Sequence, residues 1–252
     1  MTLAVTLLGA ALVGLTLGLL GAGGSILAVP ILIYAAGQPA HVAIPTALVI
    51  VAISSAGALL PRLRGGQIRW PVATVFAIGG VPAALAGAAV GHRLPAHLLM
   101  PGFAVLMVVV AVRMLRDARP VGQGCRRTPG RGRPPGCLLK ALSAGAGVGL
   151  LTGVFGVGGG FAIVPALTLL LGLTQAEAAA TSLVIIVVNS LASFAGHLGT
   201  HLDPVTIAEF AGIALVVSVA TGRLAQRIPA RTVRRIFGWT VIALAPLVAL
   251  AG

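Results

Sequence analysis

The chain has 252 residues, of which 58% are hydrophobic and only 8% charged, whereas a soluble domain carries about a quarter charged residues. Its net charge of +13 comes from seventeen basic residues and four acids. Such a charge can indicate nucleic-acid binding, but here the arginines lie between apolar runs of transmembrane length, a pattern typical of loop charge in membrane proteins. The composition therefore excludes a soluble domain and predicts a chain embedded in the lipid bilayer that binds no nucleic acid.

Ten hydrophobic runs follow one another along the chain, separated by Gly, Pro and Arg. A crossing helix needs about 20 residues, and most runs approach this length. The second and seventh runs have only about 13 residues, and each follows a glycine cluster and contains a proline, Pro30 or Pro165. We expect these two to be half-helices or re-entrant segments, whether or not they fully cross. The runs cover residues 3–20, 24–36, 42–60, 71–90, 98–116, 138–155, 160–172, 176–196, 204–222 and 233–251.

An Arg/Pro/Gly-rich segment, residues 117–137, separates the first five runs from the last five. This composition predicts a polar tether, with a lipid-headgroup or partner site as the open alternative. Cys125 and Cys137 both fall in it without metal-ligand spacing, and we interpret them as reduced thiols. No Lys or Arg precedes Arg62, so the first run lacks the basic start of a secretory signal and is expected to remain as a span.

The two halves are copies of one unit. "GLLGAGGSILAVPIL" from Gly18 matches "GVFGVGGGFAIVPAL" from Gly153, and the register continues without a gap at an offset of 135 residues. Fourteen of the 43 positions in 18–60 and 153–195 are identical, including glycines, a proline and a threonine that apolar bias alone does not explain.

The arginines predict how the copies are oriented. If residues 117–137 are cytoplasmic and every run crosses, all basic residues except Arg93 are cytoplasmic and both termini are external. Each half has five runs, so the second copy is inverted relative to the first. The predicted fold is an all-α polytopic membrane protein with a 5+5 inverted-topology repeat, about eight full spans and two short segments. Its parts are residues 1–116, the linker 117–137 and residues 138–252.

The two glycine clusters are the first candidates for a substrate site. A helix that begins just after a glycine cluster presents free N–H groups and a positive dipole end, a combination that suits an anion. The alternative is close helix packing through small residues. The candidate cradles are formed by Gly21, Gly23, Gly24 and Ser25 in the first half and by Gly156, Gly158, Gly159 and Gly160 in the second.

Polar side chains in the third and eighth runs are the second set of candidates, although such residues often bond a helix backbone instead. The duplicated pair Thr46 and Thr181 stands out, as does Asn189, which takes the place of Ser54 in the second copy. The predicted substrate-binding residues of these runs are Thr46, Ser55, Thr181, Ser182, Asn189 and Ser190.

The acids and histidines provide no catalytic or metal site. Glu177, Asp203 and Glu209 lie near predicted span ends and Asp117 lies in the linker, so no buried proton relay is visible. Glu209 is the nearest candidate for one, and an interfacial position is its alternative. His197 and His201 are four residues apart and with Asp203 leave a metal or other cation carrier as an alternative. We predict no enzyme activity and no cofactor.

The doubled Gly-x-Gly-Gly followed by Pro, with "TSLVIIVVNSLASFAGH" from Thr181, resembles the sulfite exporter TauE/SafE family, also called the 4-toluene sulfonate uptake permeases. The resemblance covers nearly all the chain outside the linker. It implies a transporter of small anions, such as sulfite, sulfonates or related organic acids, in a bacterial inner membrane. Ser25 stands where a third glycine is common.

We expect alternating access, in which the inverted halves rock around an anion between the glycine-led segments. A non-transporting membrane assembly factor stays as a further alternative. Substrate identity, direction, coupling ion and oligomeric state cannot be read from the residues.

Overall fold

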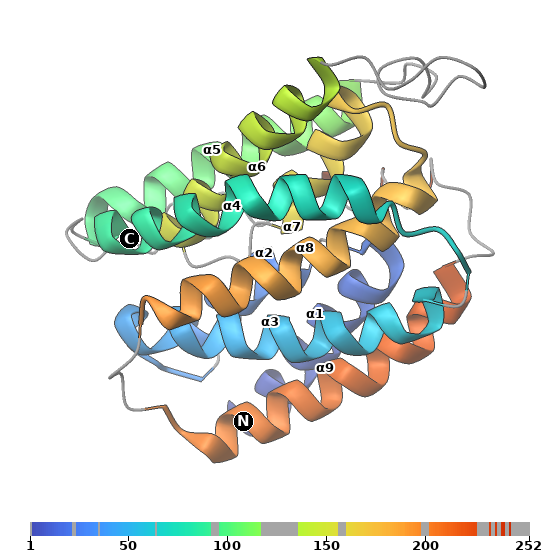
Figure 1. Cartoon of the computed structure of the whole chain (residues 1–252). Helices are drawn as coiled ribbons and strands as arrows, with labels where there is room; N and C mark the ends of the chain where they lie inside the picture. The colour runs from blue at the N-terminus through green and yellow to red at the C-terminus, as the bar shows by residue number, and fades with distance from the viewer. Residues whose placement is uncertain are drawn as a thin grey trace.

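The computed structural model describes residues 2–21, 24–34, 36–63, 65–91, 96–116, 136–155, 160–197 and 202–225, together with 232, 235, 238, 239 and 242. In this part of the chain every regular element is a helix (Figure 1). Most of the linker and most of the tenth predicted run lie outside the described residues. The helices are α1 (Thr2–Leu20), α2 (Gly24–Tyr34), α3 (Ala40–Leu63), α4 (Trp70–Gly91), α5 (Ala96–Arg116), α6 (Gly136–Phe155), α7 (Gly160–Pro165), η1 (Ala166–Leu170), α8 (Gln175–Ala195) and α9 (Pro204–Ala225).

Five described helices are long and apolar enough to cross a membrane, namely α3, α4, α6, α8 and α9. Their ends agree with the predicted runs to within a few residues, because length and hydropathy alone define a span. The all-helical fold of a membrane protein is thus confirmed for the described residues.

The two segments predicted to be short are short. α2 has 11 residues, and α7 has 6 before the chain widens into η1, a π-helix of 5 residues. An 11-residue helix is only about 17 Å long, roughly half of a hydrocarbon core. Pro165 ends α7 because proline lacks the N–H that the next α-helical hydrogen bond needs. α2 and α7 contact each other.

Helices of the first half pack mainly on helices of the second. α4 lies along α6, α1 lies along α9, and α8 lies between α3 and α4 (Figure 1). Glycines allow the closest of these contacts. A Cβ on Gly149 of α6 would lie 2.7 Å from the Cα of Gly80, and a Cβ on Gly14 of α1 would lie 2.5 Å from the carbonyl oxygen of Ala214 in α9. Such small-residue seams let helix backbones approach without polar side chains.

Cys137, in the first turn of α6, is buried and disulfide-bonded. The prediction of a reduced thiol is therefore wrong for this residue. The sequence does not distinguish the two states, because two cysteines separated by eleven residues in a polar segment are compatible with a disulfide and with two free thiols. Cys125 lies outside the described residues.

Candidate functional site

Eight hydroxyl and amide side chains of α3 and α8, two helices that contact each other, are fully buried. They come from both halves of the chain and include all six polar residues predicted to bind substrate in the third and eighth runs. The eight are Thr46, Ser54 and Ser55 on α3, and Thr181, Ser182, Asn189, Ser190 and Ser193 on α8.

Six of these eight side chains have no hydrogen-bond partner among the described residues. A buried polar group without a partner is costly, so nearly all such groups in native proteins are satisfied by protein, water or ligand. The unsatisfied atoms are the hydroxyls of Thr46, Ser54, Ser55, Ser190 and Ser193, and both the Oδ1 and the Nδ2 of Asn189.

Other hydroxyls in the described helices behave differently. Those of Thr16, Thr152 and Thr168 donate to the carbonyl oxygen four residues earlier, at 2.8–2.9 Å. This bond to the helix's own backbone is the usual solution for Ser and Thr in a lipid-embedded helix. The six unpartnered side chains do not use it. Their donors and acceptors are therefore available to a polar molecule in the protein interior.

Asn189 has the largest unused capacity of the six, because an amide can make up to four hydrogen bonds. Its side chain lies against Gly80 of α4, where an added Cβ would be 2.8 Å from Oδ1 and 3.0 Å from Nδ2. Any larger residue at position 80 would therefore press on this amide. The glycine leaves the space that the amide group occupies.

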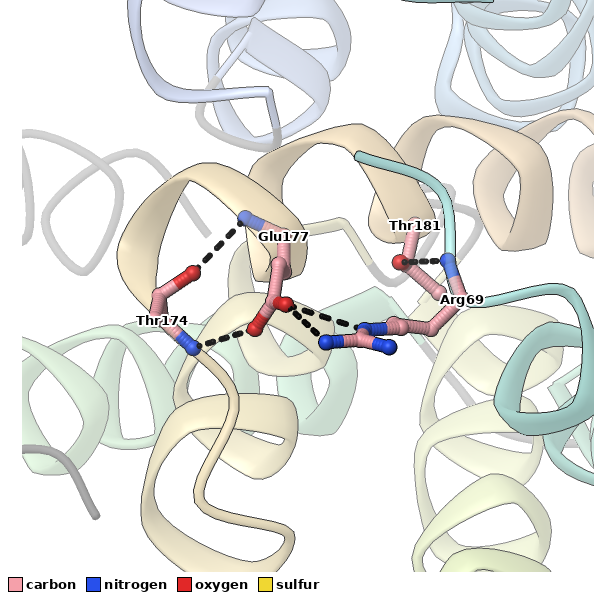
Figure 2. A network of polar contacts seen from close by, with 4 residues as sticks. All are labelled: Arg69, Thr174, Glu177 and Thr181. Atoms are coloured by element: carbon pink, nitrogen blue, oxygen red, sulfur yellow. Dashed lines mark hydrogen bonds and ion pairs between the residues drawn. The ribbon is translucent and has the colours of Figure 1, made fainter. Parts of the chain in front are cut away.

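Thr181 and Ser182, also predicted to bind substrate, have protein partners. The Thr181 Oγ1 accepts a hydrogen bond from the backbone N–H of Arg69 at 3.0 Å (Figure 2). The Ser182 Oγ lies within donating distance of two carbonyl oxygens, 2.8 Å from that of Gly21 and 3.0 Å from that of Ala179. Both hydroxyls hold the start of α8 to segments of the first half.

The first glycine cluster is closely packed. Gly21 has a φ of +72°, and a Cβ there would lie 2.5 Å from the carbonyl oxygen of Ala179. A Cβ on Gly24 would press on the backbone of Val13. These two glycines thus pack closely against neighbouring backbone, as the packing alternative expects, and their role in an anion cradle stays a prediction. Ser25 lies in α2, Gly160 begins α7 and is buried, and the remaining cluster residues, Gly23, Gly156, Gly158 and Gly159, lie outside the described residues.

Charged residues meet at the start of α8 (Figure 2). The Arg69 Nε donates to the Glu177 Oε1 at 2.9 Å, and Arg69 Nη2 forms an ion pair with the same oxygen. Glu177 also completes a capping box: its Oε2 accepts from the Thr174 N–H at 3.0 Å, and the Thr174 Oγ1 accepts from the Glu177 N–H at 3.3 Å. This network starts α8 and joins it to the segment between α3 and α4.

Arg62 is the residue that the sequence did not single out. It was expected to be cytoplasmic loop charge, but α3 continues through Pro61 to Leu63 and only 4% of Arg62 is exposed. Its Nη2 donates to the carbonyl oxygen of Gly18 at 2.7 Å, and its Nη1 to that of Ala179 at 3.3 Å. Nothing in the local sequence distinguishes Arg62 from Arg64 and Arg69, since no acid precedes Asp117.

Near the opposite end of α8, Asp203 and His197 have local bonding partners. The Asp203 carboxylate accepts hydrogen bonds from Thr206 and from the N–H of Val205 as α9 begins, which lowers the pKa of this exposed carboxyl. The ring of His197 is 2.8 Å from the carbonyl oxygen of Ser193. The described residues contain no group of three His, Cys, Asp or Glu that could hold a metal, and His201 lies outside them. Glu209 is exposed on α9.

Comparison with known proteins identifies the family. The chain matches the family model described as sulfite exporter TauE/SafE over residues 6–247. The chain belongs to the TauE/SafE family. It is 34% identical to a probable membrane transporter protein of Xylella fastidiosa strain Temecula1, over 97% of this chain and 94% of the relative, and 33% identical to the protein of the same description in strain 9a5c, with the same coverage.

A relative with lower identity, the probable membrane transporter protein YunE of Bacillus subtilis, is 27% identical over 71% of this chain and 72% of its own length. No solved structure matches the chain significantly. The chain is therefore a member of a family of membrane transporters, and the family resemblance inferred from the glycine motifs is confirmed.

Proposed function

We propose that this protein transports small anions, with sulfite, sulfonates and related organic acids as the substrate class, by alternating access between two inverted repeats. The observation that carries the proposal is the set of six buried, unpartnered polar side chains on α3 and α8. Neutral hydroxyls and an amide can donate hydrogen bonds to an anion that sheds its water in the protein.

The packing supports an inverted repeat. Gly14 and Gly18 of α1 approach Ala214 and Ser218 of α9, and their counterparts at an offset of 135, Gly149 and Gly153 of α6, approach Gly80 and Ala84 of α4. The first helix of each half, α1 or α6, thus packs through glycines on the fourth helix of the other half, α9 or α4. Equivalent helices related by a pseudo-two-fold axis would produce this reciprocal pattern.

The turns after the short helices support the repeat as well. Gly37 follows α2 with a φ of +66°, and Gly172 follows η1 with a φ of +68°. They are 135 residues apart, the offset found in the sequence. The helices that carry the unpartnered side chains, α3 and α8, follow these turns and occupy equivalent places in the two copies.

The charges favour an anion over a cation. Cation carriers usually hold carboxylates within their spans. Here Glu177 is paired with Arg69 at the start of α8, Asp203 caps α9, and Glu209 is exposed on α9. In the described part of the chain, the buried polar residues of α3 and α8 are therefore neutral side chains and the cation Arg62, with no acid among them.

Counterflow in proteoliposomes with labelled sulfite, sulfate, small sulfonates and carboxylates, with and without a proton gradient, tests the proposal. Thr46→Val removes an unpartnered hydroxyl, and Asn189→Ala removes the unpartnered amide; both should lower anion flux at least tenfold while folded protein is retained, since no protein bond is lost. Thr152→Val is the matched control, because Thr152 is equally buried but bonds its own helix. No anion flux in the wild type, or equal flux in Thr46→Val and Thr152→Val, would overturn the proposal.

A further inference from the structure

Arg62 has an unusual environment for a charged side chain. It lies at the end of α3, where the end of α1 and the start of α8 meet, and its two bonds go to backbone carbonyl oxygens, one in each half of the chain. Gly18 is among the last residues of α1, where helix carbonyls lack partners, so this bond caps α1. The longer bond, to Ala179, reaches across to α8.

Arg62 has no carboxylate partner among the described residues. The chain has four acids, and the structure describes three of them. Glu177 forms its bonds with Arg69 and Thr174. Asp203 and Glu209 lie at or near the start of α9. The other end of α9, at Gly222, is the one that approaches Gly18, the residue bonded to Arg62. A buried guanidinium remains charged and is expensive to bury unless an anion or several hydrogen bonds compensate it. Two carbonyl oxygens use only two of its five N–H donors.

An unpartnered side chain lies on the same face of α3. Ser55 is fully buried without a hydrogen-bond partner, and it precedes Arg62 by seven residues, which is two helical turns or about 10 Å. Arg62 thus lies closer to the end of α3 than the three unpartnered side chains of that helix, Thr46, Ser54 and Ser55. An anion that reaches these side chains from this end of α3 would meet a fixed positive charge.

We propose that Arg62 binds the anionic group of the transported substrate at this end of the α3–α8 pair, and that the anion takes the place of the Ala179 carbonyl oxygen. A hydrogen bond from a guanidinium to an oxyanion is shorter and about twice as strong as one to a neutral carbonyl oxygen. The bond to Ala179, at 3.3 Å, is longer than the 2.7 Å bond to Gly18, so we expect the anion to replace the bond to Ala179. Its loss would release a contact between the halves. The inference rests on the anion-transport function proposed above.

Arg69 provides the matched control. It lies seven residues further along and also contacts α8, but its charge is already compensated by Glu177 and its side chain is half exposed. Arg62→Gln keeps hydrogen-bond donors and removes the charge, whereas Arg62→Lys keeps the charge and removes the planar fork. Arg69→Gln breaks an exposed ion pair and should change little.

The measurements are sulfite counterflow in liposomes and the increase in thermal unfolding temperature that sulfite produces in detergent. Arg62→Gln should raise KM by roughly ten- to a hundredfold and abolish the sulfite-induced increase in Tm, as expected for a lost charged hydrogen bond. Arg62→Lys should show a smaller rise in KM. Arg69→Gln should keep both wild-type values.

A merely structural role would give a different result. Arg62→Gln would then lower Tm without ligand but keep the sulfite-induced increase and the wild-type KM, and this outcome overturns the proposal. If Arg62→Gln does not fold, Arg62→Lys decides, and an unchanged KM in that variant overturns the proposal. Failure of the wild type to transport or bind any anion would instead refute the proposed function itself.

Discussion

The seam between α4 and α6 depends on the absence of a side chain at position 149. A Cβ on Gly149 would lie 2.7 Å from the Cα of Gly80 and nearer still to its carbonyl oxygen. Carbon atoms in contact need about 3.5–4.0 Å, so the helices would have to separate by roughly 1 Å at this point. Overpacking of this kind costs about 1–3 kcal/mol. We therefore expect Gly149→Ala to lower the free energy of unfolding by that amount.

Gly147, two residues earlier in the same helix, provides the control. A Cβ there would have nothing within 4 Å, so Gly147→Ala should be neutral or stabilise the helix by up to about 1 kcal/mol. The two variants have the same composition and are compared by thermal unfolding in one detergent. If Gly149→Ala unfolds at the same temperature as Gly147→Ala, the close seam between α4 and α6 is wrong.

Two further predictions concern a turn and a helix cap. Gly21→Ala should destabilise the protein more than Gly37→Ala. Both positions have positive φ, which costs about 1–2 kcal/mol for alanine. Only at Gly21 would the new Cβ also clash with backbone atoms, those of Ala179. Equal losses in thermal unfolding would contradict this. The hydrogen bond from the Thr206 hydroxyl is the main cause that lowers the pKa of Asp203 in the folded protein. The ionised carboxylate should therefore stabilise the folded state above the unfolded pKa of about 3.9, and this stabilisation should disappear as the pH falls through the folded pKa. Asp203→Asn should lack this pH dependence in unfolding curves, and an identical pH profile would argue against the cap.

The fold was largely predictable because the properties that define it are local. An apolar run of about 20 residues specifies a span without reference to the rest of the chain, and a glycine cluster followed by proline specifies a short helix. The described ends of α3, α4, α6 and α8 accordingly agree with the predicted runs to within three residues.

The site was less predictable because it depends on contacts between distant residues. Thr46 and Thr181 are equivalent in the repeat, yet only Thr181 meets a partner, the N–H of Arg69 at 112 residues' separation. Ser193 is also unpartnered, although it was not among the residues predicted to bind substrate. Whether a hydroxyl is satisfied cannot be read from the pattern of one helix.

Arg62 was misread for a related reason. The third hydrophobic run was predicted to end at residue 60, which placed Arg62 in a loop, whereas α3 continues one turn further and buries the arginine against α1 and α8. Positive charge at the end of a span is usually topogenic, and burial is what distinguishes Arg62 from the half-exposed Arg69.

Because the helices of each half pack mainly on helices of the other half, the structure indicates how a chain of this kind could form from two shorter polypeptides. The closest seams, between α1 and α9 and between α4 and α6, join one half to the other, so neither half completes its own packing. Two half-length polypeptides inserted in opposite directions could form both seams. On the proposed repeat, the present protein is thus the covalent form of an antiparallel dimer, and co-expression of residues 1–116 and 138–252 as separate chains would reconstitute it only when the two insert in opposite orientations.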